Sequence, residues 1–198
     1  MSTFFKLFLF HAIFVLTIYF FSYALIQYQE FNKLDKNNQW CFNVSLIIEI
    51  VVFLFAAISY STVKNIRILS RSLFIIFIVS FIIESSIRGF RKFASYSSII
   101  ESFCIIAVYL LILFHEFDRH PTNWYKQPVA LFSITLLIYF ICSVPYFSLM
   151  HYFQKHNPTL NQILFHLVIN VMAHVRYCVL AFAFWLSRKT FQKIKTHS

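Results

Sequence analysis

The sequence predicts an all-α protein, a polytopic transmembrane helix bundle that forms one integral membrane domain over residues 1–198. Three observations lead to this fold class. The chain is 60% hydrophobic and only 12% charged, whereas a soluble domain is about a quarter charged. Its apolar runs continue for about 20 residues, the length that an α-helix needs to cross a bilayer, and they lack the alternation of a transmembrane β-barrel. One glycine and four prolines leave little room for irregular structure.

Six apolar runs are long enough to span a bilayer. The first is too long for the core of a cleaved signal peptide, so we expect a retained anchor helix. The short turn at residues 64–67 predicts that the second and third helices are antiparallel neighbours. Pro128 suits the first turn of the fifth helix, whereas Pro145 inside it predicts a kink. The predicted spans are residues 7–28, 43–63, 68–87, 97–115, 128–149 and 160–187.

The net charge of +10 does not indicate a nucleic-acid-binding protein, because the basic residues lie mostly between the apolar runs, where they act as topology signals. Six spans place both termini on one side of the membrane. That side holds the larger basic set, namely Lys6, Lys64, Arg67, Arg71, Arg119, Lys126, Arg188, Lys189, Lys193 and Lys195. The opposite loops hold Lys33, Lys36, Arg88, Arg91, Lys92 and Lys155. The positive-inside rule therefore predicts a multi-pass protein of the cell inner membrane with both termini cytoplasmic.

The sixth run combines apolar residues with an unusual set of polar ones. His166, Asn170 and His174 are spaced by four residues, so they form a stripe along one helical face. Arg176 follows them closely. Because ionisable side chains are costly against lipid, we expect these residues to face other helices or a hydrated cavity.

Three other predicted helices each carry one glutamate in the half that lies away from the termini. We expect these carboxylates to meet the polar residues of the sixth run in one cluster. Ion pairs that hold the helices in register are one explanation, and a ligand pocket or proton-linked site is the other. The cluster comprises Glu49, Glu84, Glu101, His166, Asn170, His174 and Arg176.

The residues do not form a pattern that is typical of an enzyme or of a cofactor site. His-rich metal motifs such as H-E-x-x-H do not occur, and the pairs His115/His120 and His151/His156 fall at opposite membrane faces. His11 lies at a different depth from His174, so a bis-histidine haem is not expected. No Ser/His/Asp arrangement is present, and the four cysteines are too scattered for a disulfide framework. We therefore expect no enzymatic activity, no metal and no cofactor.

One short motif matches a modification signal. Asn43-Val44-Ser45 fits the glycosylation sequon, but it sits at the predicted membrane edge, so we interpret it as a chance match.

Four short segments occur in an order that resembles a known group of proteins. They are Asn-Asn-Gln-Trp-Cys-Phe-Asn at residues 37–43, Ile-Ile-Glu-Ser-Phe at 99–103, Leu-Ile-Tyr-Phe at 137–140 and Phe-Trp-Leu-Ser-Arg-Lys at 184–189. Over about residues 5–190, the chain resembles small uncharacterised polytopic membrane proteins of Bacteroidota-type bacteria. Some of these are similar to membrane input regions of sensor histidine kinases.

The resemblance implies a shared polar position at Glu101 and a bundle of seven spans, of which this chain shows six. A first helix is then expected to be missing. Since no kinase domain follows Lys189, we expect no phosphoryl transfer by this chain itself.

The sequence thus favours a non-enzymatic sensory or accessory subunit. Its expected partners are the lipid bilayer and a larger membrane complex or a sensor kinase, with no nucleic acid. The alternative is a small transporter or channel subunit. That alternative needs a continuous polar route, for which the half nearest the termini offers only His11, His115 and Glu116.

Overall fold

The computed structural model describes residues 3–31 and 39–195. Within these ranges it does not describe the side chains of residues 3–5, 19, 29–31, 169, 170, 173, 184 and 186–195. The regular elements of the described part are all helical. In chain order they are α1 (Thr3–Phe31), α2 (Gln39–Tyr60), α3 (Lys64–Arg88), α4 (Ser95–Arg119), the short 3-10 helix η1 (Trp124–Lys126), α5 (Pro128–His156), α6 (Pro158–Phe165), the π-helix η2 (His166–Val171) and α7 (Met172–Lys195).

The first five long helices are long and apolar enough to cross a membrane. The helical elements confirm the all-α class that the composition predicted, and their lengths agree with the expected membrane protein. Most helices extend a few residues beyond the predicted apolar runs, because backbone hydrogen bonding continues into their polar ends. The second run is an exception. The predicted limits 43–63 are wrong at their C-terminal end, since α2 stops at Tyr60. There the Ser61 hydroxyl accepts a hydrogen bond from the backbone N–H of Val63 at 3.1 Å, which gives the chain an alternative to helix.

The predicted run at 160–187 is not a uniform α-helix. It starts at Pro158 in α6, where the Asn157 side chain accepts a hydrogen bond from the N–H of Leu160 at 3.0 Å. A π-helical stretch, η2, then separates α6 from α7. Within this region, the described residues His174–Ala183 form an apolar stretch of α7.

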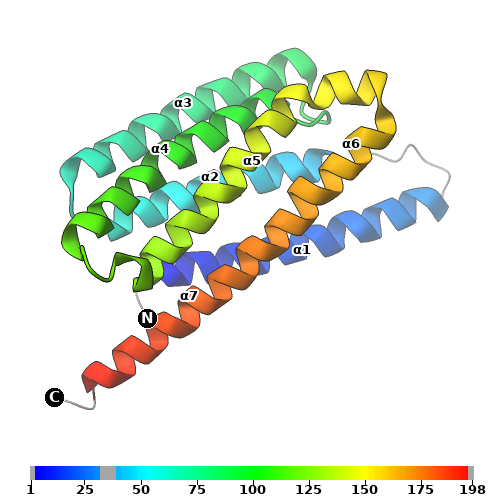
Figure 1. Ribbon diagram of the computed structural model, residues 1–198. Helices are drawn as coiled ribbons and strands as arrows, with labels where there is room; N and C mark the ends of the chain where they lie inside the picture. Colours follow the sequence, from blue (N-terminus) through cyan, green and yellow to red (C-terminus); the bar gives the residue numbers. More distant parts are fainter. Residues whose placement is uncertain (1–2, 32–38, 196–198) are drawn as a thin grey trace.

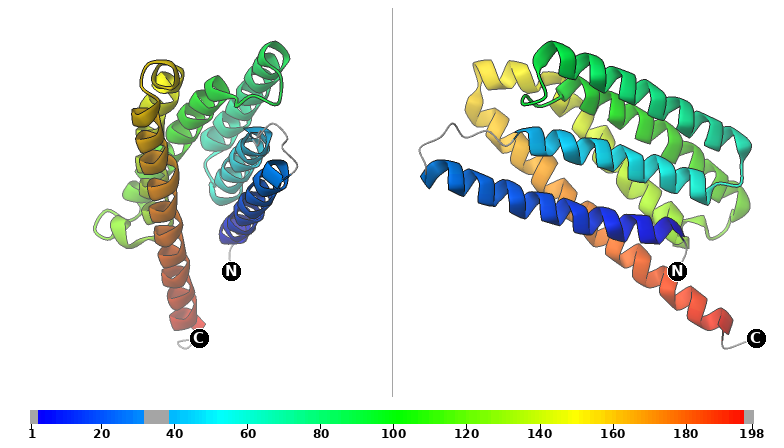
Figure 2. Two further views of the ribbon diagram at one scale, coloured as in Figure 1. Left: turned by 90° about the vertical axis from the view of Figure 1, so that its right-hand side faces the viewer. Right: turned by 180° about the vertical axis from the view of Figure 1, so that it is seen from behind.

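The helices form an elongated bundle (Figure 1). The most extensive interface joins α4 to α5, while α1 packs on α2 and α7 packs on α5. Seen end-on, α1 and α7 stand apart on the same side of the bundle (Figure 2). The first turns of α1 and the last turns of α7 lie at one end, and α7 projects past the other helices there (Figures 1 and 2).

An aromatic core fills the half of the bundle nearest the termini. Phe8, Phe53, Tyr109 and Phe132 are almost completely buried. The rings of Phe8 and Phe132 lie 4.0 Å apart between centroids, and the Tyr109 hydroxyl donates to the carbonyl of Phe53 at 3.0 Å. Because aromatic rings bury large areas and their polar groups here are satisfied, this core is tightly closed.

The opposite half is held together by a polar corner. Gly89 ends α3 with φ +82°, a conformation that side chains with a Cβ rarely adopt. The buried amide of Asn43 then binds the following turn. It donates to the carbonyls of Phe90 and Lys92, both at 2.8 Å, and accepts from the N–H of Ala94 at 2.9 Å. Both amide hydrogens are in use, which agrees with our interpretation of the sequon at Asn43 as a chance match.

Candidate functional site

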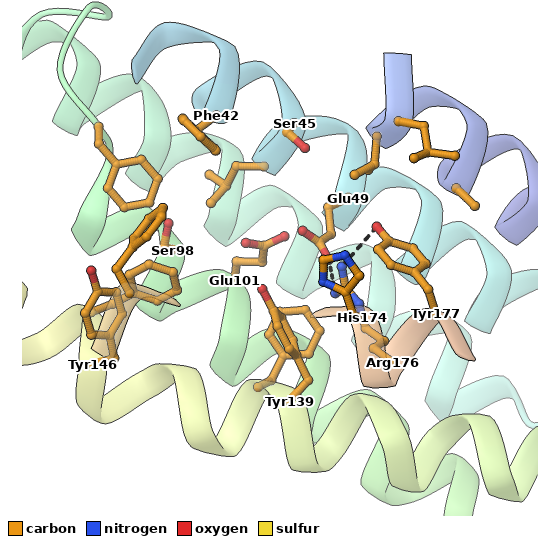
Figure 3. Close-up of a pocket in the computed structure, with 18 of the residues that line it drawn as sticks. Phe42, Ser45, Glu49, Ser98, Glu101, Tyr139, Tyr146, His174, Arg176 and Tyr177 are labelled. Carbon is orange, nitrogen blue, oxygen red and sulfur yellow. Dashed lines mark hydrogen bonds and ion pairs between the residues drawn. The ribbon is translucent and has the colours of Figure 1, made fainter. Parts of the chain in front are cut away.

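A cavity of about 1140 Å³ lies between α1, α2, α4, α5 and the α6–α7 segment. Its lining extends from Gln39, the first residue of α2, and Gln154, near the end of α5, to Phe8 and Leu180. Figure 3 shows the side chains that line it around Glu49 and Glu101. Its mouth includes Gln39, Gln154 and Asn161. Its floor includes Glu49, which lies ten residues into α2, about 15 Å along the helix axis. The walls are mostly apolar and aromatic, as is usual for small-molecule sites.

The cavity also opens sideways between α1 and α7. Leu16 and Phe20 of α1 line it and yet are 58% and 68% exposed, respectively. Leu180 and Ala181 line it from α7. These two helices therefore flank a lateral entrance, and in a membrane that entrance would face lipid.

An ion pair forms the polar floor. The guanidinium of Arg176, which is buried, donates to the Glu49 carboxylate and to the Tyr177 hydroxyl, the latter at 3.3 Å. It also stacks over the Tyr139 ring at 4.2 Å from the centroid. Opposite charge, a hydrogen bond and aromatic faces together offset the cost of burying Arg176.

Glu101 is the second carboxylate of the floor, and it has an unfilled hydrogen-bonding position. Its side chain is 3% exposed and lines the cavity beside Glu49 and Arg176 (Figure 3). Among the described residues, its Oε1 atom is buried without a hydrogen-bond partner, and so is Nε of Arg176. A buried carboxylate oxygen without a donor is costly, so this position is ready to accept a hydrogen bond from a ligand.

The polar stripe predicted on the sixth run is divided between the rim and the floor. His166 and His174 line the cavity but are exposed, whereas Arg176 is buried. In an α-helix, residues two apart point about 200° apart, so α7 cannot bury both His174 and Arg176 deeply. The Asn170 side chain lies outside the described residues.

Glu84 has a different place from the other predicted cluster residues. Its carboxylate accepts hydrogen bonds from the backbone N–H groups of Tyr96 and Ser97, at 3.2 and 2.7 Å, and from the Ser97 hydroxyl. It also pairs with Arg88 at 3.1 Å. It therefore caps the N-terminus of α4. The expectation that Glu84 shares one cluster with Glu49 and Glu101 is corrected by these contacts, because a carboxylate near an unsatisfied helix N-terminus finds its donors there.

Two further residues close to the Arg176 region had no role in the predicted cluster. Tyr139 of α5 lines the cavity. His11 of α1 is completely buried, with its ring 5.0 Å from Phe53 and 6.3 Å from Tyr177 between centroids. Both ring nitrogens of His11 lack a partner among the described residues. The one sequence signal for His11 was that it is an ionisable residue within the first apolar run.

The arrangement suits reversible binding better than metal chemistry. In the described part of the chain, no three His, Cys, Asp or Glu side chains are grouped closely enough to hold a metal ion. A mixed apolar cavity with a few convergent polar groups is instead typical of a site for a small amphipathic molecule. Comparison with protein-family models, curated proteins and solved structures found no match for this chain. Its function must therefore be inferred from the site itself.

Proposed function

We propose that this chain is a non-enzymatic sensory or accessory subunit of the cell inner membrane that binds a small molecule in the cavity between α1 and α7. The observation that carries this proposal is the unpartnered carboxylate oxygen of Glu101, buried in a cavity of about 1140 Å³. A purely structural ion-pair network would satisfy this oxygen. In a binding site, such an oxygen stays without a protein partner and is available to a ligand, because binding sites often have unfavourable arrangements that reduce stability.

The proposed topology has six spans, with α6, η2 and α7 together forming the sixth and both termini cytoplasmic. The ends of α1 and α7 lie at one end of the bundle, as an even number of spans requires. The excess of basic residues on the termini side supports the orientation.

Signalling requires that the ligand favours one helix arrangement over another. α7 forms one wall of the cavity and is joined to α2 by the pair Arg176–Glu49. A ligand at Glu101 lies next to this pair, so its binding changes the electrostatic balance that positions α7. Because α7 projects past the bundle at the termini side, it carries this change to the face where a sensor kinase or a larger membrane complex would dock.

A channel or transporter is supported less well. Transport needs a continuous polar route across the bundle, and the cavity meets the closed aromatic core of Phe8, Phe53, Tyr109 and Phe132 on the termini side. Solute flux into proteoliposomes that carry the purified chain would favour the transport alternative.

Spin-label distances between α1 and α7 test the sensory proposal. The label sites are Ile13→Cys, on an exposed position of α1, and the native Cys178 of α7, in a Cys142→Ser background. The chain is reconstituted in lipid nanodiscs, and small molecules extracted with it from native membranes are identified by mass spectrometry. We expect a co-purified amphiphile, and a shift of the α1–α7 distance distribution when it is removed and returned.

The control is a cavity-filling substitution with a matched partner. Ser45 faces the cavity (Figure 3), so Ser45→Trp should abolish both the co-purified molecule and the distance shift. Ser86 is exposed on α3, and Ser86→Trp should change neither. An α1–α7 distance that stays constant while the cavity fills would overturn the sensory role.

A further inference from the structure

The charges on the cavity floor are not balanced. The described charged residues that line the cavity, apart from its histidines, are Glu49, Glu101 and Arg176. Arg176 is already paired with Glu49, so an ionised Glu101 leaves one excess negative charge in a buried site. A buried carboxyl avoids this cost either by taking up a proton or by meeting a positive partner, and a ligand can supply the second.

The surroundings of Glu101 suit a positive partner. Tyr139 and Tyr146 line the same cavity, together with Phe42, Phe93, Phe140 and Phe147. Aromatic faces attract ammonium groups that are removed from water. The unpartnered Oε1 atom accepts hydrogen bonds and has no hydrogen to donate when the carboxylate is ionised.

The remainder of the cavity suits a hydrocarbon tail. Leu9, Ala12, Val15 and Leu16 line it along one face of α1, and the lateral entrance between α1 and α7 leads directly to the surrounding medium. A molecule dissolved in the bilayer could enter there with its tail in an apolar environment throughout, so entry does not expose the tail to water.

We propose that the ligand is an amphiphile with a protonated amine head group, which enters from the bilayer between α1 and α7 and places its ammonium on Glu101. This inference rests on the proposed function, and it assigns the chemical class of the ligand. The ammonium makes a charge-assisted hydrogen bond to the free oxygen of Glu101 and completes a floor of two carboxylates and two cations.

Four probe molecules separate the contribution of the head group to binding from the contribution of the hydrocarbon tail. They are dodecylamine, dodecanol, dodecanoate and butylamine, each titrated into the full chain in phosphatidylcholine nanodiscs and counted as bound molecules by native mass spectrometry. We expect dodecylamine to bind at least tenfold more tightly than dodecanol, and butylamine to bind weakly because it lacks the tail. Glu101→Gln should weaken dodecylamine binding at least tenfold and leave dodecanol binding unchanged.

A matched control uses the same substitution on the same helix. Glu116 is a buried carboxylate of α4 that does not line the cavity and accepts a hydrogen bond from Tyr60 at 2.5 Å. Glu116→Gln should leave dodecylamine binding unchanged. Ser45→Trp should remove the binding of all tailed probes, which shows that they occupy the cavity.

The outcomes distinguish failure of the ligand class from failure of the proposed function. Equal binding of amine and alcohol, or no effect of Glu101→Gln, would exclude the ammonium while leaving a ligand-binding cavity. Preference for dodecanoate would assign the head group to Arg176 instead. If no probe binds in a Ser45-dependent manner, and no native molecule co-purifies, the cavity is not a binding site and both proposals fail.

Discussion

Arg176 of α7 is buried against Glu49 of α2, and the pair joins two residues that are 127 positions apart in the chain. The pair Glu84–Arg88, in contrast, lies within α3. The pair Arg176–Glu49 thus joins α7 to α2, in addition to the packing of α7 on α5.

Removing one partner of this pair should be worse than removing both. Glu49→Ala leaves the Arg176 charge buried and unpaired, so we expect the free energy of unfolding to fall by about 3–5 kcal/mol. The double variant Glu49→Leu/Arg176→Met replaces the pair with apolar groups and should recover most of that loss. The free energies of unfolding of the single and double variants are measured by unfolding the helices with sodium dodecyl sulfate in mixed micelles and monitoring the transition by circular dichroism. A double variant that is as unstable as the sum of the two single variants would contradict this prediction.

Glu101 should show the opposite behaviour. Its Oε1 atom has no partner, so the folded protein gains little from its charge and bears the cost of burying it. We expect Glu101→Leu to leave the free energy of unfolding unchanged or to raise it by about 1 kcal/mol in the same assay without ligand. Glu116→Leu is the comparison, because it removes the acceptor of the Tyr60 hydroxyl and should destabilise. Strong destabilisation by Glu101→Leu would show that the carboxylate is structural.

Glu84 should affect stability without affecting binding. Glu84→Ala leaves the backbone N–H groups of Tyr96 and Ser97 without their acceptor. Loss of a cap costs about 0.5–2 kcal/mol, and the change should appear as a lower melting temperature in detergent. Occupancy of the cavity in nanodiscs should stay at the level of the unchanged protein. If Glu84→Ala instead removed the bound molecule and left the melting temperature unchanged, Glu84 would belong to the ligand-binding cluster, which would contradict this prediction.

Asn43 should be intolerant of aspartate. Its side-chain nitrogen donates to two carbonyls, those of Phe90 and Lys92. Asn43→Asp replaces this donor with an acceptor that repels both carbonyls, so we expect a larger loss of stability than for Asn43→Ala, which removes the three hydrogen bonds at about 1 kcal/mol each. Thermal melting of both variants checks the order, and Asn43→Ala being the less stable of the two would contradict it.

The sequence predicted the helices because apolar runs of membrane length leave few other folds, and it predicted that Glu49, Glu101 and Arg176 are unusual because charge within such runs is rare. It predicted that glutamates and Arg176 meet and offered ion pairs as one explanation, but it did not indicate which glutamate pairs with Arg176. The assignment of Glu84 failed for a physical reason: the run contains no sign that the next helix begins close enough for its N–H groups to bind this carboxylate. His11 and Tyr139 were left out of the predicted cluster for a similar reason, since their place beside the ion pair depends on how the helices pack.

The π-helix η2 has a consequence for how positions on this chain correspond to one another. A π-helical turn holds one residue more than an α-helical turn, so α7 is out of phase with α6 by one residue, or about 100° of rotation. Two residues on opposite sides of His166–Val171 therefore have the relative orientation of residues that are one position closer together in a continuous α-helix. His166 and His174 then correspond to i and i+7, and they align better than an uninterrupted α-helix would allow. A single-residue deletion within this segment would restore the phase and would turn the whole of α7, Arg176 included, away from its present neighbours.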